Sequence, residues 1–167
     1  MKKNFYLSLG IFISLAASRF IPHPPNFTSL LALTFYVPTL MGIRFLPVLI
    51  LSFAITDFFI GYHNLTHWTW GSIFIVSLLS IFFKENTALR LIGATTGVVI
   101  FFLITNFGVW SSGMYGYNFS SFIKTYLLAI PFFVNNLVST FVFSIIIEIF
   151  FFFFKIYSIK NHKIKLL

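Results

Sequence analysis

Two acidic residues inside otherwise apolar segments are the first candidates for chemistry in this sequence. Asp57 and Glu148 interrupt hydrophobic runs in a chain that is 59% hydrophobic and only 8% charged. An ionisable group in hydrocarbon is costly unless it faces protein or water. Asp57 therefore either binds a cation or a donor-rich ligand, or it pairs with Arg19 or caps a neighbouring helix. The sequence leaves both alternatives open.

Uncharged polar residues recur at intervals of four in the last apolar segment, a spacing that places them on one face of a helix. That face must turn away from lipid. Interhelical hydrogen bonds explain Thr140 and Ser144 equally well. We expect Asp57, Asn106 and Asn136 to face one outward-open cavity. The full polar stripe comprises Asn136, Thr140, Ser144 and Glu148, and Asn135 and Ser139 widen it near the outer end.

Motifs of catalytic and metal sites are weak. The chain has no cysteine, and it contains no P-loop, no nucleophile elbow and no paired carboxylates at short spacing. His63 and His67 are four residues apart, a spacing that could bind a metal from one helical face. An aromatic membrane interface around Trp68 explains the same stretch without a ligand. The sequence thus predicts a protein that is not an enzyme and has no cofactor, with metal binding as a weaker alternative.

The composition also predicts the elements that carry these residues. A chain of 167 residues with so much apolar sequence is typical of an integral membrane protein with a single membrane domain, residues 1–167. We predict an all-α bundle of about six transmembrane helices and a surface or re-entrant helix at about 119–130. The predicted spans are roughly 5–18, 29–41, 45–62, 71–83, 91–110 and 132–157.

Basic residues predict how the bundle is oriented, because cytoplasmic loops are enriched in lysine and arginine. Six spans with both termini in the cytoplasm leave only Arg19 and Lys124 outside. The loops 18–29, 62–71 and 110–121 then share the outer face. The net charge of +8 reflects this orientation, and no nucleic-acid partner is expected. The cytoplasmic set is Lys2, Lys3, Arg44, Lys84, Arg90, Lys155, Lys160, Lys163 and Lys165.

Small residues at four-residue spacing predict close helix packing. Gly93 and Gly97 have this spacing in one segment, and Gly10, Ser14 and Ser18 have it in the first. Packing within the bundle is the simpler explanation. The alternative is a partner helix that docks on the first span.

Four stretches, "RFIPHPPNFTSLLAL", "ITDFFIGYH", "LITNFGVW" and "AIPFFVNNL", together resemble an uncharacterised bacterial membrane-protein family, known as a domain of unknown function. That family is similar to the substrate-binding S components of energy-coupling-factor vitamin transporters. The resemblance implies a pocket open to the outside, capped by the three outer loops, and a docking face for a coupling subunit with ATPases. The implied docking residues are Gly10, Ser14 and Ala17.

We therefore expect a protein of the cell inner membrane that binds a small solute for uptake, with the loop 18–29 as a lid. A structural subunit of a membrane complex is the main alternative, and metal-ion uptake is a less favoured one. Besides the lipid bilayer, the expected partners are an unidentified small molecule and the coupling protein. The ligand-binding candidates are Arg19, His23, Asn26, Asp57, Trp68, Asn106, Trp110, Asn135 and Asn136.

Overall fold

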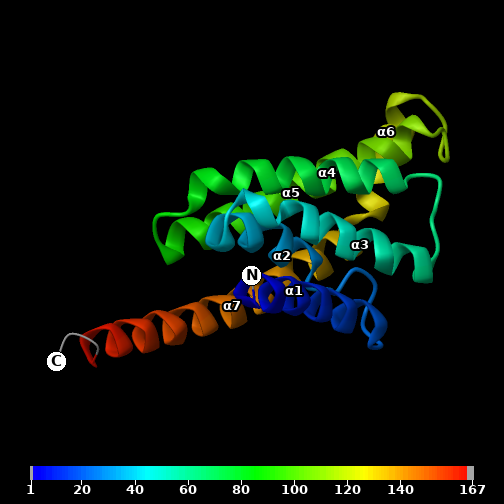
Figure 1. The fold of residues 1–167 in the computed structure, drawn as a ribbon. Helices are drawn as coiled ribbons and strands as arrows, with labels where there is room; N and C mark the ends of the chain where they lie inside the picture. Colours follow the sequence, from blue (N-terminus) through cyan, green and yellow to red (C-terminus); the bar gives the residue numbers. More distant parts are fainter. Residues whose placement is uncertain (1, 165–167) are drawn as a thin grey trace.

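The computed structural model describes residues 2–164, and the side chains of residues 4–156. Its described residues form helices and connecting segments, which confirms the all-α prediction (Figure 1). The elements are α1 (Lys2–Phe20), α2 (Leu30–Tyr36), η1 (Val37–Met41), η2 (Ile43–Phe45), α3 (Leu46–Ile60), α4 (Thr66–Leu79), η3 (Ser80–Phe83), α5 (Thr87–Ser111), α6 (Phe119–Leu128) and α7 (Ile130–Ile164).

Helix α2 forms the centre of the bundle. Every residue from Ser29 to Pro38 is buried, and α2 packs against α1, α4, α5 and α7. Leu15 of α1, Leu49 of α3 and Ile73 of α4 are nearly inaccessible in the surrounding core. A helix that is apolar on all sides suits such a central position.

The central helix widens and then stops because of two residues. Pro38 has no backbone N–H and disfavours a regular α-helix, and the chain forms the π-helical turn η1 at this point. Gly42 follows with a φ of 95°, which an L-residue with a side chain rarely adopts. The whole segment Leu30–Met41 is about 18 Å long at about 1.5 Å per residue, shorter than the roughly 30 Å hydrocarbon core of a bilayer.

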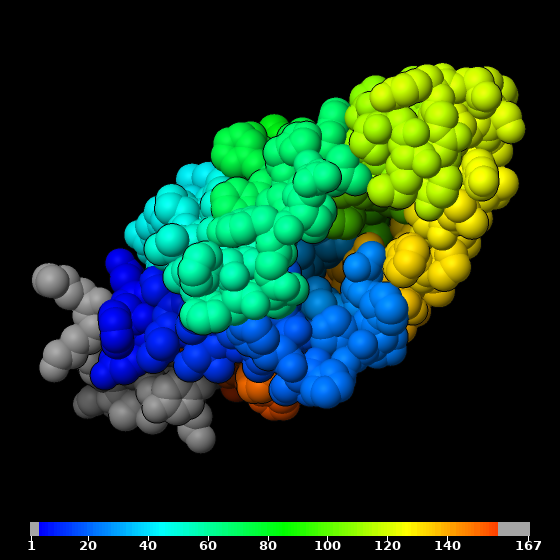
Figure 2. All heavy atoms as spheres, turned by 90° about the vertical axis from the view of Figure 1, so that its right-hand side faces the viewer, coloured from blue at the N-terminus to red at the C-terminus, as the bar shows by residue number. Residues whose placement is uncertain are grey.

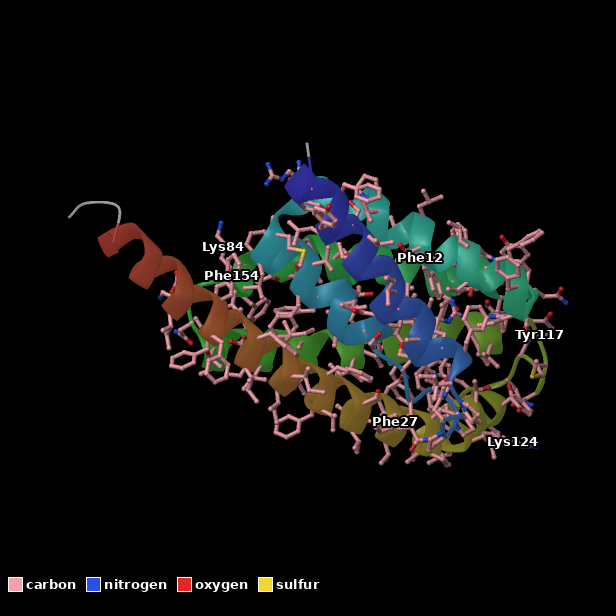
Figure 3. The ribbon with its side chains drawn as sticks, turned by 60° about the horizontal axis from the view of Figure 1, so that its bottom comes forward. Phe12, Phe27, Lys84, Tyr117, Lys124 and Phe154 are labelled. Carbon is pink, nitrogen blue, oxygen red and sulfur yellow. The ribbon has the colours of Figure 1, made fainter. Side chains whose placement is uncertain are left out.

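Successive helices run back and forth between two ends of the bundle. At one end, Arg19 of α1 contacts Asp57 of α3, and Trp70 of α4 contacts the same carboxylate. At the other, Arg90 of α5 meets Glu148 of α7. We call these the Asp57 end and the Glu148 end. Lys84 and Phe154 lie near the Glu148 end, whereas Tyr117 and Lys124 lie at the opposite end (Figure 3).

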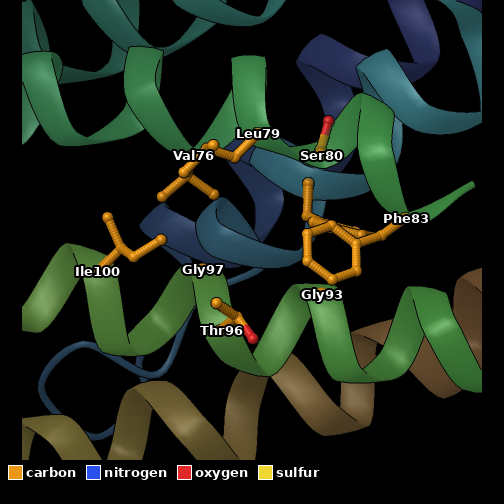
Figure 4. Close-up of a pocket in the computed structure, with 9 residues that line it drawn as sticks. Val76, Leu79, Ser80, Phe83, Gly93, Thr96, Gly97 and Ile100 are labelled. Atoms are coloured by element: carbon orange, nitrogen blue, oxygen red, sulfur yellow. The ribbon is translucent and has the colours of Figure 1, made fainter.

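Two glycines let α5 pack closely on its neighbours. A Cβ at Gly93 would lie 2.6 Å from the rings of Phe35 and Phe83, and one at Gly97 would lie 2.8 Å from Val76 Cγ1. The glycine pair therefore packs within the bundle. A small apolar cavity of about 130 Å³ remains beside this contact, between α4, η3 and α5 (Figure 4).

Four helical stretches are long and apolar enough to cross a membrane: Ile43–Ile60, Thr66–Phe83, Thr87–Ser111 and Ile130–Ile156. Their large exposed side chains include Phe58, Phe82 and Phe150, as expected of a surface that faces lipid. These features suggest a membrane protein. The predicted spans 5–18 and 29–41 correspond to α1 and to the shorter apolar helix Leu30–Met41, so the number of crossings stays a prediction.

The basic residues divide between the two ends as the sequence predicts: Arg44, Lys84 and Arg90 lie toward the Glu148 end, and Arg19 and Lys124 toward the Asp57 end. Which end faces the cytoplasm stays a prediction. The side chains of the terminal lysines used for that orientation lie outside the described residues: Lys2, Lys3, Lys160, Lys163 and Lys165.

Candidate functional site

Asp57 is bound on both carboxylate oxygens. Arg19 Nη2 donates to Oδ1 at 2.6 Å, and Trp70 Nε1 donates to Oδ2 at 2.8 Å. Arg19 also donates to the hydroxyl of Thr56, and its guanidinium carbon lies 4.5 Å from the centroid of the Phe53 ring. Of the two roles that the sequence leaves open for Asp57, this geometry matches pairing with Arg19. Trp70 was not predicted as a partner.

The segment 21–29, which we call the strap, connects α1 to α2 across the Asp57 end. Asn26 has a φ of 64° and turns the chain in the left-handed region that asparagine tolerates better than most residues. His23 Nδ1 lies 2.7 Å from the Pro24 carbonyl oxygen. Asn135 Nδ2 of α7 donates to the Pro25 carbonyl at 2.9 Å. The strap is thus tied to α7 by a residue predicted to bind ligand.

The surface of the Asp57 end is hollowed. Figure 2 shows a recess bounded by the strap, by the residues that join α3 to α4, and by α6 with the start of α7. The first two boundaries lie in the loops 18–29 and 62–71, and α6 directly follows the third loop, 110–121, that the sequence groups with them. Helix α4 begins at Thr66, so Trp68 is helical instead of lying in a loop. The Thr66 hydroxyl accepts from the His63 backbone N–H, which favours this earlier start.

The remaining candidates at this end differ in burial and in whether their polar side-chain atoms already form hydrogen bonds. Asn106 Nδ2 donates to the Phe102 carbonyl of its own helix at 2.8 Å. Trp68 packs on Gly108, where a Cβ would lie 2.4 Å from its ring. Trp110 Nε1 is buried and has no hydrogen-bond partner among the described residues. Asn136 is 8% exposed on the buried side of α7. Trp110 and Asn136 are therefore the better ligand-binding candidates.

The polar stripe of α7 faces inward, as its spacing predicts. Asn136, Thr140 and Ser144 are all buried. Within the described residues, the hydroxyls of Thr140 and Ser144 have no hydrogen-bond partner, and neither has that of Tyr36 on α2. Ser144 nevertheless lies beside the Tyr36 hydroxyl of α2, so contact between helices stays one of the two explanations for the stripe.

Glu148, at the far end of the stripe, is held by a partner that the sequence did not identify. Arg90 Nε and Nη2 donate to its two carboxylate oxygens, each at 2.6 Å, and Thr87 Oγ1 donates to Oε2 at 3.1 Å. Arg90 is only 6% exposed. The sequence holds one signal for this pair: Arg90 follows the helix cap Asn86 by four residues, which places it at the same end of the bundle as Glu148.

The proposed docking residues border a groove between α1 and α7. Gly10, Ser14 and Ala17 are exposed, and Ser14 and Ala17 line an apolar groove of about 480 Å³ opposite Phe143 and Ile147. A Cβ at Gly10 would contact no neighbouring atom. Ser18 is half-buried and lines the same groove, and its hydroxyl lies 2.7 Å from that of Ser29. This face of α1 is therefore accessible from outside the bundle.

The histidines form no metal cluster in the part of the chain described, where no group of three His, Asp or Glu side chains comes together. His63 Nδ1 accepts from the Leu65 N–H at 3.2 Å, and the ring of His67 packs 5.7 Å from that of Trp68. Both residues lie where α4 begins, at the rim of the Asp57 end.

Together, the fold and its exposed apolar surface define the class: an all-helical protein with apolar helices that suggest a membrane location. The chain belongs to a family of unknown function, DUF6580, which matches residues 1–163. No curated protein and no solved structure matches the chain. The similarity to S components and a role in transport stay predictions.

Proposed function

We propose that this protein binds a small solute in the recess at the Asp57 end and acts as the solute-binding component of an uptake system in the inner membrane, similar to an S component. The observation that carries the proposal is the recess itself, closed on one side by the strap (Figure 2). A solute bound there would touch the strap, the connection between α3 and α4, and α6, and so would be enclosed by separate parts of the chain.

The two stronger candidates for contact with such a solute, Trp110 and Asn136, are uncharged. Asp57 and Arg19 neutralise each other, and their hydrogen-bonding atoms are largely occupied. The buried Trp110 Nε1 of α5 has no hydrogen-bond partner among the described residues, and Asn136 lies in the part of α7 near the Asp57 end and is 8% exposed. Aromatic side chains around Trp110 include Phe107 and Phe122, with ring centroids 5.5 Å away in each case. This environment favours a partly apolar ligand with a few hydrogen-bonding groups.

Purification followed by native mass spectrometry tests this proposal. A small molecule should accompany the wild-type protein, and Trp110→Phe and Asn136→Ala should lower its occupancy. Thr95→Ala is the matched control, because that hydroxyl bonds only to the Leu91 carbonyl of its own helix. A wild-type protein without bound solute, or equal occupancy in all three variants, would refute solute binding in the recess.

The orientation that uptake requires can be tested separately, because the sequence contains no cysteine. Single cysteines at Lys84 and Lys124 would mark the Glu148 and Asp57 ends. A membrane-impermeant thiol reagent added to intact cells should label the cysteine at position 124 and leave that at 84 unlabelled until the membrane is opened. The reverse pattern would turn the recess toward the cytoplasm and exclude uptake from outside.

The groove between α1 and α7 favours a second role, in which the chain docks on another membrane protein. Small exposed residues allow close approach of a partner helix, and Ser14 and Ala17 provide such a surface. For an uptake system the partner would be a coupling subunit with ATPases, and in the alternative role it would be another subunit of a structural complex. Ser14→Trp should abolish co-purification of the partner, whereas Leu51→Trp on exposed α3 surface should not.

A further inference from the structure

Helix α6 is attached to the bundle mainly through two aromatic side chains that contact α5. The ring centroid of Phe122 lies 5.5 Å from that of Trp110, and Tyr126 Oη donates to the Leu103 carbonyl at 2.8 Å. Trp110 lies in the last turns of α5 and Leu103 lies deeper in the bundle. Helix α6 therefore runs back beside α5, from the end of that helix toward its middle.

The opposite face of α6 is apolar and exposed. Phe119, Ile123 and Leu127 recur at four-residue spacing, and they are 79%, 42% and 59% exposed respectively. The hydroxyl-bearing residues Ser121 and Thr125 are instead buried, at 4% and 2%, and their hydroxyls donate to backbone carbonyls. A helix at the surface of a water-soluble protein has the reverse pattern, with apolar residues inside and polar residues outside. This burial pattern thus favours an apolar surrounding for α6.

The helices next to α6 expose apolar side chains at the same level. Leu103 of α5 is 50% exposed, and Ile130, the first residue of α7, is 46% exposed. Both residues belong to stretches long and apolar enough to cross a membrane, Thr87–Ser111 and Ile130–Ile156. The exposed face of α6 therefore adjoins surface that meets lipid when these helices span a bilayer.

The position of α6 along α5 indicates how deeply it would lie in that bilayer. A charged pair such as Arg90–Glu148 is expected at an edge of the hydrocarbon core, and α5 rises about 20 Å from Arg90 to Leu103 at about 1.5 Å per residue. The core is about 30 Å thick, so its other edge falls near Trp110. The end of α6 that contacts Leu103 then lies inside the core, and the end that contacts Trp110 lies at its boundary.

Lys124 is the basic residue of α6. Its ammonium nitrogen lies 5.4 Å from the ring centroid of Tyr115, in the segment that connects α5 to α6. Among the described residues, Lys124 forms no ion pair with an acidic side chain. A lysine can keep its stem against apolar surroundings and extend its charge to the membrane interface. The anionic group available there is the phosphate of a lipid headgroup.

We propose that α6 is embedded in the membrane and binds phospholipid of the leaflet at the Asp57 end. The face formed by Phe119, Ile123 and Leu127 contacts acyl chains, and Lys124 binds the phosphate. The buried hydroxyls of α6 and its level beside Leu103 favour lipid over a water-soluble partner. This lipid site does not depend on solute binding in the recess.

Spin labelling of the full chain in vesicles of phosphatidylcholine and phosphatidylglycerol tests the proposal, because the sequence contains no cysteine. A nitroxide is attached to single variants Phe119→Cys, Ile123→Cys and Leu127→Cys. Its relaxation by molecular oxygen, which concentrates in lipid, is compared with relaxation by a nickel chelate, which stays in water. The reference sites are Val99→Cys on exposed α5 surface and Asn64→Cys in the exposed connection between α3 and α4.

The oxygen-to-nickel ratio at Leu127→Cys should approach that at Val99→Cys and exceed that at Asn64→Cys severalfold. It should decrease from Leu127 through Ile123 to Phe119, because α6 rises toward the boundary of the core. Equal ratios at the three positions would mean that α6 lies flat on the membrane. Ratios as low as that of Asn64→Cys would place the face in water, and poor access for both reagents would mean that a protein chain covers it. Each of these three results would overturn the proposal.

The phosphate contact has its own readout. In native mass spectrometry after partial removal of lipid, Lys124→Gln should retain less phospholipid than the wild-type protein. Lys124→Arg should retain the wild-type amount, because it keeps the positive charge. Ser120→Ala, at another exposed position of α6, is the matched control. Equal retention in all four proteins would refute the binding of phosphate by Lys124.

Discussion

The two buried ion pairs lie at opposite ends of the bundle and are built differently. Arg90 forms a bidentate fork with Glu148 and joins α5 to α7, which are 58 residues apart at these positions. Arg19 reaches Asp57 through one nitrogen, and Trp70 binds the other carboxylate oxygen. A planar fork adds geometric specificity and strength. The Glu148 end is thus fixed by one strong pair, and the Asp57 end by several smaller contacts beside a recess.

Removing one charge from the stronger pair should have the largest effect. Glu148→Ala leaves the buried Arg90 guanidinium unpaired and should lower the free energy of unfolding by about 3–5 kcal/mol. Denaturation in detergent, followed by circular dichroism, measures the change. The double variant Glu148→Leu with Arg90→Met removes both charges and should recover most of the loss. A double variant no more stable than the single one would show that the pair is not the cause.

At the Asp57 end, Asp57→Asn should cost less, about 2–3 kcal/mol, because the amide oxygen can still accept one hydrogen bond. Trp70→Phe removes only the indole donor and should cost about 1 kcal/mol. The same denaturation measurement applies to both variants. If Asp57→Asn costs as much as Glu148→Ala, the proposed difference between the two ends is wrong.

Close packing at the recess gives a third test. A Cβ at Gly108 would lie 2.4 Å from the Trp68 ring, so Gly108→Ala should displace that ring and cost about 1–2 kcal/mol through overpacking. It should also lower solute occupancy in native mass spectrometry, since Trp68 lies in the first turn of α4, directly after the connection that borders the recess.

Gly71, also in a helix, is the matched control, because a Cβ at this position would have no neighbouring atom within 4 Å. Gly71→Ala should therefore stabilise the protein by about 0.5–1 kcal/mol. Equal effects at the two glycines would contradict the packing seen around Trp68.

The sequence predicted features that depend on one helix better than features that depend on two. The four-residue spacing of Asn136, Thr140 and Ser144 correctly placed them on the inward face of α7. Pairing of Asp57 with Arg19 was foreseen as one alternative. Arg90 was interpreted only as a marker of orientation, although it binds Glu148, because the sequence does not reveal that α5 and α7 are neighbours.

The central position of α2 was also not predictable from composition, since a short apolar helix in the core and a membrane span have similar sequences. Its burial on all sides results from four surrounding helices. Tyr36 was missed for this reason: only the contact of α2 with α7 brings its hydroxyl next to Glu148. The same limit applies to Trp70, which reaches Asp57 across the junction of α3 and α4.

The smallest effect on stability is expected at the strap, which crosses the Asp57 end. Asn135→Ala removes the hydrogen bond to Pro25 and should cost about 0.5–1 kcal/mol, since the site is partly exposed. The strap should nevertheless open more often, so bound solute should leave faster, as measured by exchange against excess free solute. Thr95→Ala, which loses only a bond within its own helix, is the matched control. If both variants release solute at the wild-type rate, the strap is a connector between α1 and α2, and the recess does not depend on its closure.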